Sequence, residues 1–237
     1  MLKIEHLTKK FGDKVAVDDL SLNIPDGQIC AFIGHNGAGK TTTLKSIAGI
    51  IDYEGKIEIN GIDVNKNPLE AKKIISYIPD NPDLYEHLKG IDYLNFIADV
   101  FNVKTDIRKS KIECYSKKLE IYNDLSSPIS SYSHGMKQKL ALVSALIHSP
   151  KLLLLDEPFV GLDPISSHAF KEIMQNIAKE GSTIFYSTHV LDVAEKICSH
   201  VAIIKKGKLV AYDTMQNITN NDSLENIFLE IENENRT

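Results

Sequence analysis

Short apolar runs alternate with amphipathic stretches of helical spacing through most of the chain, which is typical of strands followed by helices. The N-terminal residues also alternate like a strand. The other expected strands are Gln28–Ile33, Gly55–Ile59, Lys151–Leu155, Ser182–Ser187, His200–Lys205 and Lys208–Asp213. Several of these runs are apolar throughout, as in strands buried on both faces of a sheet. The pattern predicts an α/β fold with a mainly parallel sheet.

Helices are expected between these strands. Lys40–Ala48 follows a glycine-rich loop, and Pro164–Lys179 begins with Asp163 as N-cap and Pro164 in the first turn. The second helix should bury one apolar face, formed by Ala169, Phe170, Ile173, Met174 and Ile177.

The middle of the chain has a different pattern. From about 88 to 149 there is no convincing strand, and Asp92–Phe101, Ile107–Leu119 and Gly135–Ile147 are expected to be helices. We interpret this stretch as a helical subdomain inserted into the α/β core. Residues 220–237 are expected to form a final helix that packs on the core, followed by a frayed tail.

Charge excludes one class of function and constrains another. The chain has 27 basic and 32 acidic residues, a net charge of −5, and only two arginines, Arg108 and Arg236. A duplex DNA-binding surface rich in arginine is therefore not expected. No apolar run approaches the roughly 20 residues of a membrane span. A phosphate anion would have to be held by a lysine, a metal or backbone N–H groups.

The segment Gly34-His-Asn-Gly-Ala-Gly-Lys-Thr41 matches the phosphate-binding loop motif G-x-x-x-x-G-K-[ST]. It follows an expected strand and opens an expected helix, so its N–H groups and the helix dipole would favour a phosphate. Lys40 would reach the β- and γ-phosphates, and Thr41 would bind Mg²⁺. The alternative to a phosphate-binding loop is a glycine-rich turn that only precedes a helix. The expected ATP contacts here are Gly34, His35, Asn36, Gly37, Ala38, Gly39, Lys40, Thr41 and Thr42.

A second phosphate-site element is the apolar strand that ends in Asp156 and Glu157. Asp156 is expected to hold Mg²⁺, and Glu157 to orient or deprotonate the attacking water. Adjacent strand residues point to opposite faces. The two acids can have different roles only if the strand has just ended, as Pro158 suggests. The alternative is an ordinary polar strand end.

With these motifs the sequence resembles the ATP-binding subunits of ABC transporters. Tyr132-Ser-His-Gly-Met136 is similar to the signature motif LSGGQ, Gly161-Leu-Asp163 to the D-loop, and Thr188-His189 to the switch histidine, all in the family's order. The resemblance implies one ATPase domain over residues 1–237. It would comprise a P-loop NTPase core with an antiparallel β portion near the N-terminus and the helical insert.

The family also implies roles for these residues. Ser133, Gly135 and Asp163 would meet ATP held by another subunit, His189 would contact the γ-phosphate, and Phe11 would stack on adenine with Val17 nearby. Each has a plainer alternative: Ser133 and Asp163 as helix N-caps, His189 as a structural histidine, and Phe11 as a core residue.

The sequence departs from the family at Asp80, where glutamine is usual in the loop joining the core to the helical subdomain. Asp80 is expected to add a third carboxylate near Asp156 and Glu157, and to make activity depend more steeply on Mg²⁺. Together with His134 and Met136, it resembles a subgroup paired with ABC-2 type exporter subunits.

The resemblance implies an ATPase that works as a head-to-tail dimer, with ATP and Mg²⁺, at the cytoplasmic face of the membrane. Its partners would be a second copy or a homologous ATPase subunit and an integral membrane permease, with no nucleic acid. One rival is a soluble ABC ATPase acting on nucleic acid or ribosomes. Another is a small-molecule P-loop kinase, which would leave Ser133, Asp163 and His189 unexplained.

Overall fold

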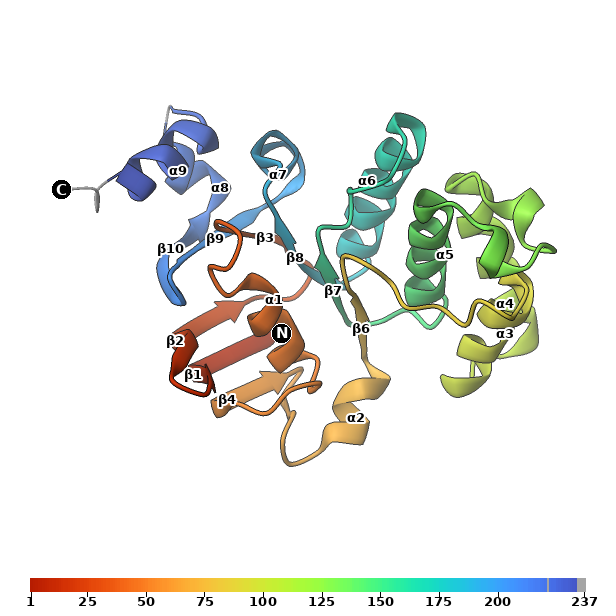
Figure 1. The fold of residues 1–237 in the computed structure, drawn as a ribbon, viewed down its shortest axis with the longest axis horizontal. Coiled ribbons are helices and arrows are strands. Elements are labelled where there is room, and N and C mark those ends of the chain that lie inside the picture. The colour runs from red at the N-terminus through yellow and green to blue at the C-terminus, as the bar shows by residue number, and fades with distance from the viewer. Residues whose placement is uncertain (221, 234–237) are drawn as a thin grey trace.

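A six-stranded sheet forms the centre of the protein in the computed structural model, which describes residues 1–220 and 222–233 (Figure 1). Its strand order is β10-β9-β3-β8-β7-β6. The strands are β3 (Ile29–Ile33), β6 (Ile75–Ile78), β7 (Leu152–Asp156), β8 (Thr183–Thr188), β9 (His200–Lys205) and β10 (Lys208–Thr214). All neighbouring pairs are parallel except β9 and β10. The predicted mainly parallel sheet is confirmed.

A second, antiparallel sheet of order β2-β1-β4-β5 is built mostly from the N-terminal residues. Its strands are β1 (Leu2–Phe11), β2 (Lys14–Ile24), β4 (Glu54–Ile59) and β5 (Ile62–Asp63). This is the antiparallel portion that the family resemblance implied. Three strands were not predicted. β2 has no long apolar run, β5 has only two residues, and β6 has only four residues, with Ser76 and Tyr77 at its middle.

Side-chain alternation divides the interior into two cores. One face of the central sheet, with Leu152, Leu154 and Phe185, packs with α1 (Lys40–Ile47) and the antiparallel sheet. The other face, with Leu153 and Tyr186, packs with the helices on the opposite side. The helices on that opposite side are α6 (Pro164–Lys179), α7 (Leu191–Ile197), α8 (Met215–Thr219) and α9 (Leu224–Asn233). A further helix, α2 (Pro68–Lys73), packs with the core that contains α1. Asp156 and Ser187 continue the alternation of the α1 face, which directs the end of β7 toward α1.

The middle of the chain contains helices, as its pattern predicts. α3 (Gly90–Val100), α4 (Thr105–Lys118) and α5 (His134–Leu146) lie together at one end of the molecule (Figure 1). Two short 3-10 turns, at Tyr122–Asp124 and Ile129–Ser131, separate α4 from α5. From Leu140 onward α5 is buried on nearly all sides, because it contacts α3, α4 and β6 at once. The buried surface of α5 is therefore not limited to one apolar stripe.

The last described helix, α9, packs on the core through Leu224, which is fully buried. It contacts α7 and α8. The frayed tail that we expected beyond it lies at 234–237, outside the described residues. Among the helices of the described ranges, none has both the length and the apolar character needed to cross a membrane.

Candidate active site

The loop between β3 and α1 is shaped by glycines that cannot be replaced without moving backbone. Gly39, the N-cap of α1, has φ 115° and no side chain to cap the helix. A Cβ on Gly39 would lie 2.6 Å from the carbonyl oxygen of Ala16, and one on Gly34 would lie 2.4 Å from that of Ile204. The first turn of α1 has no acidic residue. Its N–H groups therefore remain available to an anion such as a phosphate.

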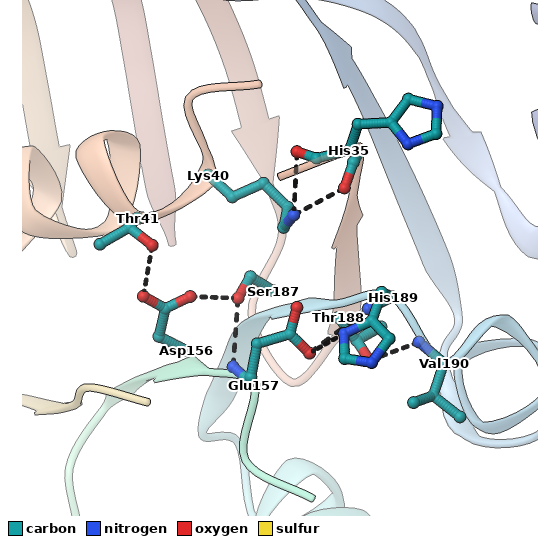
Figure 2. A network of polar contacts seen from close by, with 10 residues as sticks. His35, Lys40, Thr41, Asp156, Glu157, Ser187, Thr188, His189 and Val190 are labelled. Carbon is teal, nitrogen blue, oxygen red and sulfur yellow. Dashed lines mark hydrogen bonds and ion pairs between the residues drawn. The ribbon is translucent and has the colours of Figure 1, made fainter. Parts of the chain in front are cut away.

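Lys40 lies along the inside of this loop. Its ammonium donates hydrogen bonds to the carbonyl oxygens of Gly34 at 2.6 Å and His35 at 3.3 Å (Figure 2). Burial lowers the pKa of Lys40, and the nearby Glu157 and Asp156 oppose that shift. The lysine is thus held by loop carbonyls at the place where the motif predicts the β- and γ-phosphates.

The residues expected to hold a metal meet between α1 and β7. The Thr41 hydroxyl donates to Oδ2 of Asp156 at 2.6 Å, and the Ser187 hydroxyl donates to Oδ1 (Figure 2). A hydroxyl and a carboxylate are the hard oxygen donors that suit Mg²⁺, which usually takes one or two protein ligands together with substrate phosphates and water. In the ranges 1–220 and 222–233, no three His, Cys, Asp or Glu side chains cluster as a metal site. Asp80 lines the same cavity as Asp156 and Glu157, and its role as a metal ligand stays a prediction.

Glu157 points away from Asp156 because the backbone turns between them. β7 ends at Asp156, and Glu157 has φ 49°, in the left-handed region that non-glycine residues seldom adopt. Its Oε2 lies 2.9 Å from Nδ1 of His189 and accepts a hydrogen bond from the His189 backbone N–H at 3.3 Å. The strand therefore ends where the two acids require it, and each acid has its own set of neighbours.

A cavity of about 490 Å³ lies over the loop and the two acids. It is lined by Phe11, Lys14, Ala16, Asn36, Gly37, Gly39, Lys40, Thr41, Thr42, Asp80, Asp156 and Glu157. Phe11 is 52% exposed, so the core alternative for this residue is wrong. Val17 is fully buried and does not line the cavity. It lies below the loop, where its Cγ2 would be 3.5 Å from a Cβ on Gly39.

A second cavity of about 620 Å³ adjoins the first and shares Asn36, Asp80 and Glu157 with it. Its other lining residues are Gly34, His35, Val160, Thr188, His189, Leu191 and Phe228. Ala38 lines neither cavity; its N–H closes a turn onto the carbonyl of His35 at 3.0 Å. The side chain of His189 is 61% exposed. It is therefore not a buried structural histidine, and its contact with Glu157 holds it at this edge.

Residues 17–160, more than half of the chain, match the family model described as ABC transporter. The chain belongs to the ABC transporter family. An uncharacterized ABC transporter ATP-binding protein of Methanocaldococcus jannaschii is 39% identical to it, over 92% of this chain and 79% of that protein. A lantibiotic transport ATP-binding protein of Streptococcus pyogenes is 36% identical, over 92% and 94%.

A solved ATP-binding subunit of an ABC transporter has the same fold, with a TM-score of 0.94 and 32% identity over 98% of this chain and 99% of that one. As an ABC transporter ATP-binding protein, the chain is an ATPase. A small-molecule kinase is thereby excluded.

The signature and D-loop residues of this ABC protein form a separate cluster. Ser133 caps α5 by accepting a hydrogen bond from the Met136 N–H at 3.2 Å. Asp163 caps α6, accepting from the Ser166 N–H at 2.8 Å, and lies 2.6 Å from the ammonium of Lys139. That ammonium and the Ser166 donors hold the pKa of Asp163 well below its usual range. The capping roles are present, and contact with a partner's ATP stays a prediction.

Two glycines join this cluster together. A Cβ on Gly135 would lie 2.5 Å from the carbonyl oxygen of Gly161, and a Cβ on Gly161 would lie 2.8 Å from the His134 ring. The start of α5 and the loop before α6 are thus in backbone contact. Within the described residues, Ser133, Gly135 and Asp163 line neither of the two cavities.

Sequence reasoning missed several residues of the site. Lys14, Ala16, Val160, Leu191 and Phe228 line the cavities because distant elements fold back on them. Ser187 is fully buried and bonds to Asp156, yet a serine near the end of an apolar strand looks ordinary. Its one signal is register. Ser187 is the Cα partner of Asp156, so both side chains lie on the same face.

Proposed function

We propose that two copies of this chain, or this chain and a homologous one, close head to tail around two ATP molecules and power transport through a separate membrane subunit. The observation that carries the proposal is the position of Ser133. It is exposed at the start of α5, in a part of the fold separate from α1 (Figure 1). Among the described residues that line the nucleotide cavity there is no signature residue, and a second chain related by two-fold symmetry would supply it.

In this dimer the residues of the cavity would divide the work. Phe11 would stack on the adenine, while the loop N–H groups and Lys40 hold the phosphates. Mg²⁺, held by Thr41 and Asp156, would neutralise charge on the β- and γ-phosphates. Glu157 would accept a proton from the attacking water, oriented through His189, and the products are ADP and phosphate. Loss of the γ-phosphate contacts would then open the dimer.

With only two arginines in the chain, the charge that develops on the γ-phosphate would be met by other groups. Lys40, the loop N–H groups and the partner's helix start, capped by Ser133, would provide this stabilisation. The neutral hydroxyl cap of α5 leaves its dipole uncompensated, which favours an anion at that end.

Mixing two inactive variants tests the shared site. A chain with Lys40→Ala has a defective phosphate loop, and a chain with Ser133→Ala has a defective signature. The mixed dimer would contain one complete site, so mixing should restore part of the ATPase activity. Ser133→Thr, which keeps the hydroxyl cap, is the matched control and should stay active alone. Absence of rescue at every mixing ratio would contradict the shared site.

The membrane subunit would dock beside the loop that carries Asp80. Tyr85 and Phe96 form an exposed aromatic surface there, with their ring centroids 5.7 Å apart and edges facing. Exposed aromatic groups of this kind are typical of protein contact sites. In co-expression with a membrane subunit that co-purifies with the wild-type chain, Tyr85→Ser with Phe96→Ser should prevent co-purification. Tyr122→Ser, at an exposed tyrosine elsewhere on the helical insert, should not.

The direction of transport is proposed to be export, since the Streptococcus pyogenes relative is named for lantibiotic transport and the Asp80, His134 and Met136 pattern resembles exporter subunits. Inside-out vesicles containing both subunits should accumulate a lantibiotic only with ATP, and not with Lys40→Ala. ATPase activity stimulated by ribosomes or nucleic acid, but not by the membrane subunit, would favour the alternative function.

A further inference from the structure

A buried hydroxyl links the two acids of the active site. Ser187 is fully buried near the end of β8, and it is the Cα partner of Asp156 on β7. Its hydroxyl donates to Oδ1 of Asp156 and accepts a hydrogen bond from the backbone N–H of Glu157 at 3.2 Å. Figure 2 shows the continuous path from Thr41 through Asp156, Ser187 and Glu157 to His189.

The Asp156 carboxylate depends on this hydroxyl for its orientation. Asp156 is only 4% exposed, and a buried carboxylate requires hydrogen-bond donors. Thr41 donates to Oδ2 and Ser187 to Oδ1, so the two donors fix the plane of the carboxylate from opposite sides. Without Ser187, Asp156 could rotate about its side-chain bonds and turn Oδ2 away from Thr41.

The other side of Ser187 holds Glu157. The backbone N–H of Glu157 lies 3.2 Å from both the hydroxyl and the carbonyl oxygen of Ser187. This anchoring accompanies the left-handed φ of 49° that directs the Glu157 carboxylate toward His189. A shift of Ser187 would therefore move the metal-binding acid and the water-activating acid together.

We propose that Ser187 is a positioning residue of the ATPase. It would set the orientation of Asp156 for Mg²⁺ and couple it to Glu157. The inference rests on the proposed metal role of Thr41 and Asp156. Groups that orient a metal ligand typically change metal affinity by about 10- to 100-fold when they are removed. A hydroxyl that only satisfies buried polarity would affect folding stability and leave metal dependence unchanged.

The same strand offers a matched control. Thr183, at the other end of β8, is also fully buried, and its hydroxyl bonds to the Gly27 N–H and the Pro25 carbonyl oxygen, each at 3.1 Å. Thr183→Val and Ser187→Ala each remove one buried hydroxyl from β8. Only the second removes a contact with an acid of the site, so a purely structural role predicts similar behaviour for both.

The test measures equilibrium binding of a fluorescent ATP analogue to the full chain across a Mg²⁺ titration. Without Mg²⁺, Ser187→Ala should bind the analogue within about twofold of wild type. Its Mg²⁺ midpoint should rise about 10-fold or more, and kcat should fall more than KM changes. Thr183→Val should keep the wild-type midpoint. Ser187→Cys, which replaces the hydroxyl with a somewhat larger group that donates only weakly, should shift the midpoint in the same direction by less.

The possible results distinguish failure of the Ser187 role from failure of the metal role of Thr41 and Asp156. If wild type binds the analogue equally with and without Mg²⁺, the proposed metal site fails, and the role of Ser187 fails with it. If Asp156→Asn raises the midpoint while Ser187→Ala and Ser187→Cys stay within twofold of wild type, only the positioning role of Ser187 is overturned. An equal shift in Thr183→Val would also overturn it.

Discussion

The N-termini of α1 and α6 differ in capping: α6 has a side-chain cap and α1 has none. α6 begins with Asp163, whose carboxylate accepts from the Ser166 N–H, and with Pro164, which has no N–H to satisfy. α1 begins with Gly39, which offers no side chain, and its first turn carries no acid. One helix thus carries its own anion and the other leaves its donors for a ligand. An anion site at a helix start depends as much on the residues left out as on those present.

The largest expected effect separates ATP binding at the uncapped N-terminus of α1 from ATP hydrolysis. Glu157→Gln should lower ATP turnover by about 100-fold or more, because the amide cannot accept the proton of the attacking water. ATP binding should persist, since α1 and Lys40 are unchanged. Phosphate release and equilibrium binding measure the two quantities. Glu180→Gln, which removes a carboxylate beyond the far end of α6, is the control. Turnover equal to wild type would exclude Glu157 as the water-activating residue.

The second prediction makes α1 resemble α6 by giving it an acid. Thr42→Glu places a carboxylate in the first turn of α1 and should weaken ATP binding by about 10-fold or more relative to Thr42→Gln, which has nearly the same size. Ser167→Glu puts the same charge in the first turn of α6 and should leave binding unchanged. Titration with a fluorescent nucleotide measures all three. Equal affinities for the Glu and Gln variants at position 42 would contradict the comparison.

The third prediction removes the N-cap of α6. Asp163→Ala removes the cap of α6 and leaves Lys139 without its carboxylate, and should destabilise the protein by about 1–2 kcal/mol. Because the folded-state pKa of Asp163 is lowered, its contribution is fully present above the unfolded value of about 3.9 and is lost as pH falls below it.

Urea unfolding from pH 7 to 3 checks both claims about Asp163. The stability difference between wild type and Asp163→Ala should be constant from pH 7 to 5 and shrink below pH 4. Nucleotide affinity of the single chain should not change. A stability difference that grows toward pH 3 would show that the Asp163 carboxylate is not the stabilising group.

The smallest expected effect concerns Asp80, which, like Glu157, lines both cavities beside the start of α1. Asp80→Gln should shift the Mg²⁺ midpoint of ATPase activity upward by about two- to fivefold and make the dependence shallower, because a neutral carbonyl replaces a charged metal ligand. Asp83→Asn, in the same loop but outside both cavities, is the control. An unchanged midpoint for Asp80→Gln would remove Asp80 from the metal site.

The sequence was sufficient for the parts of the site that are local. The loop from Gly34 to Thr41, the cap at Asp163 and the strand end at Asp156 each follow from residues a few positions apart. Glu157 illustrates the limit. The need for a strand end was visible, but the φ of 49° and the hydrogen bond from the Glu157 N–H to Ser187, 30 residues away in the chain, were not. Ser187 itself could not be recognised without the register that pairs it with Asp156.

The parts of the fold that sequence patterns missed have physical reasons. β6 is short, and Ser76 interrupts its apolar pattern because its hydroxyl bonds to the Ala145 carbonyl at 2.8 Å. The sequence could not show whether Phe11 is buried or exposed, since other phenylalanines of this chain are found in both environments. Its exposure follows from its position at the end of β1, beside the turn into β2. Such cases depend on tertiary neighbours that no local pattern contains.

The contact between Gly135 and Gly161 restricts how this protein can vary. A methyl group at position 135 would overlap the carbonyl of Gly161, and one at position 161 would overlap the ring of His134. Neither position can gain a side chain unless the other segment moves. A substitution at one position should therefore survive only with a second change in the other segment. Suppressor mutations selected against Gly135→Ala should fall in the loop around Gly161.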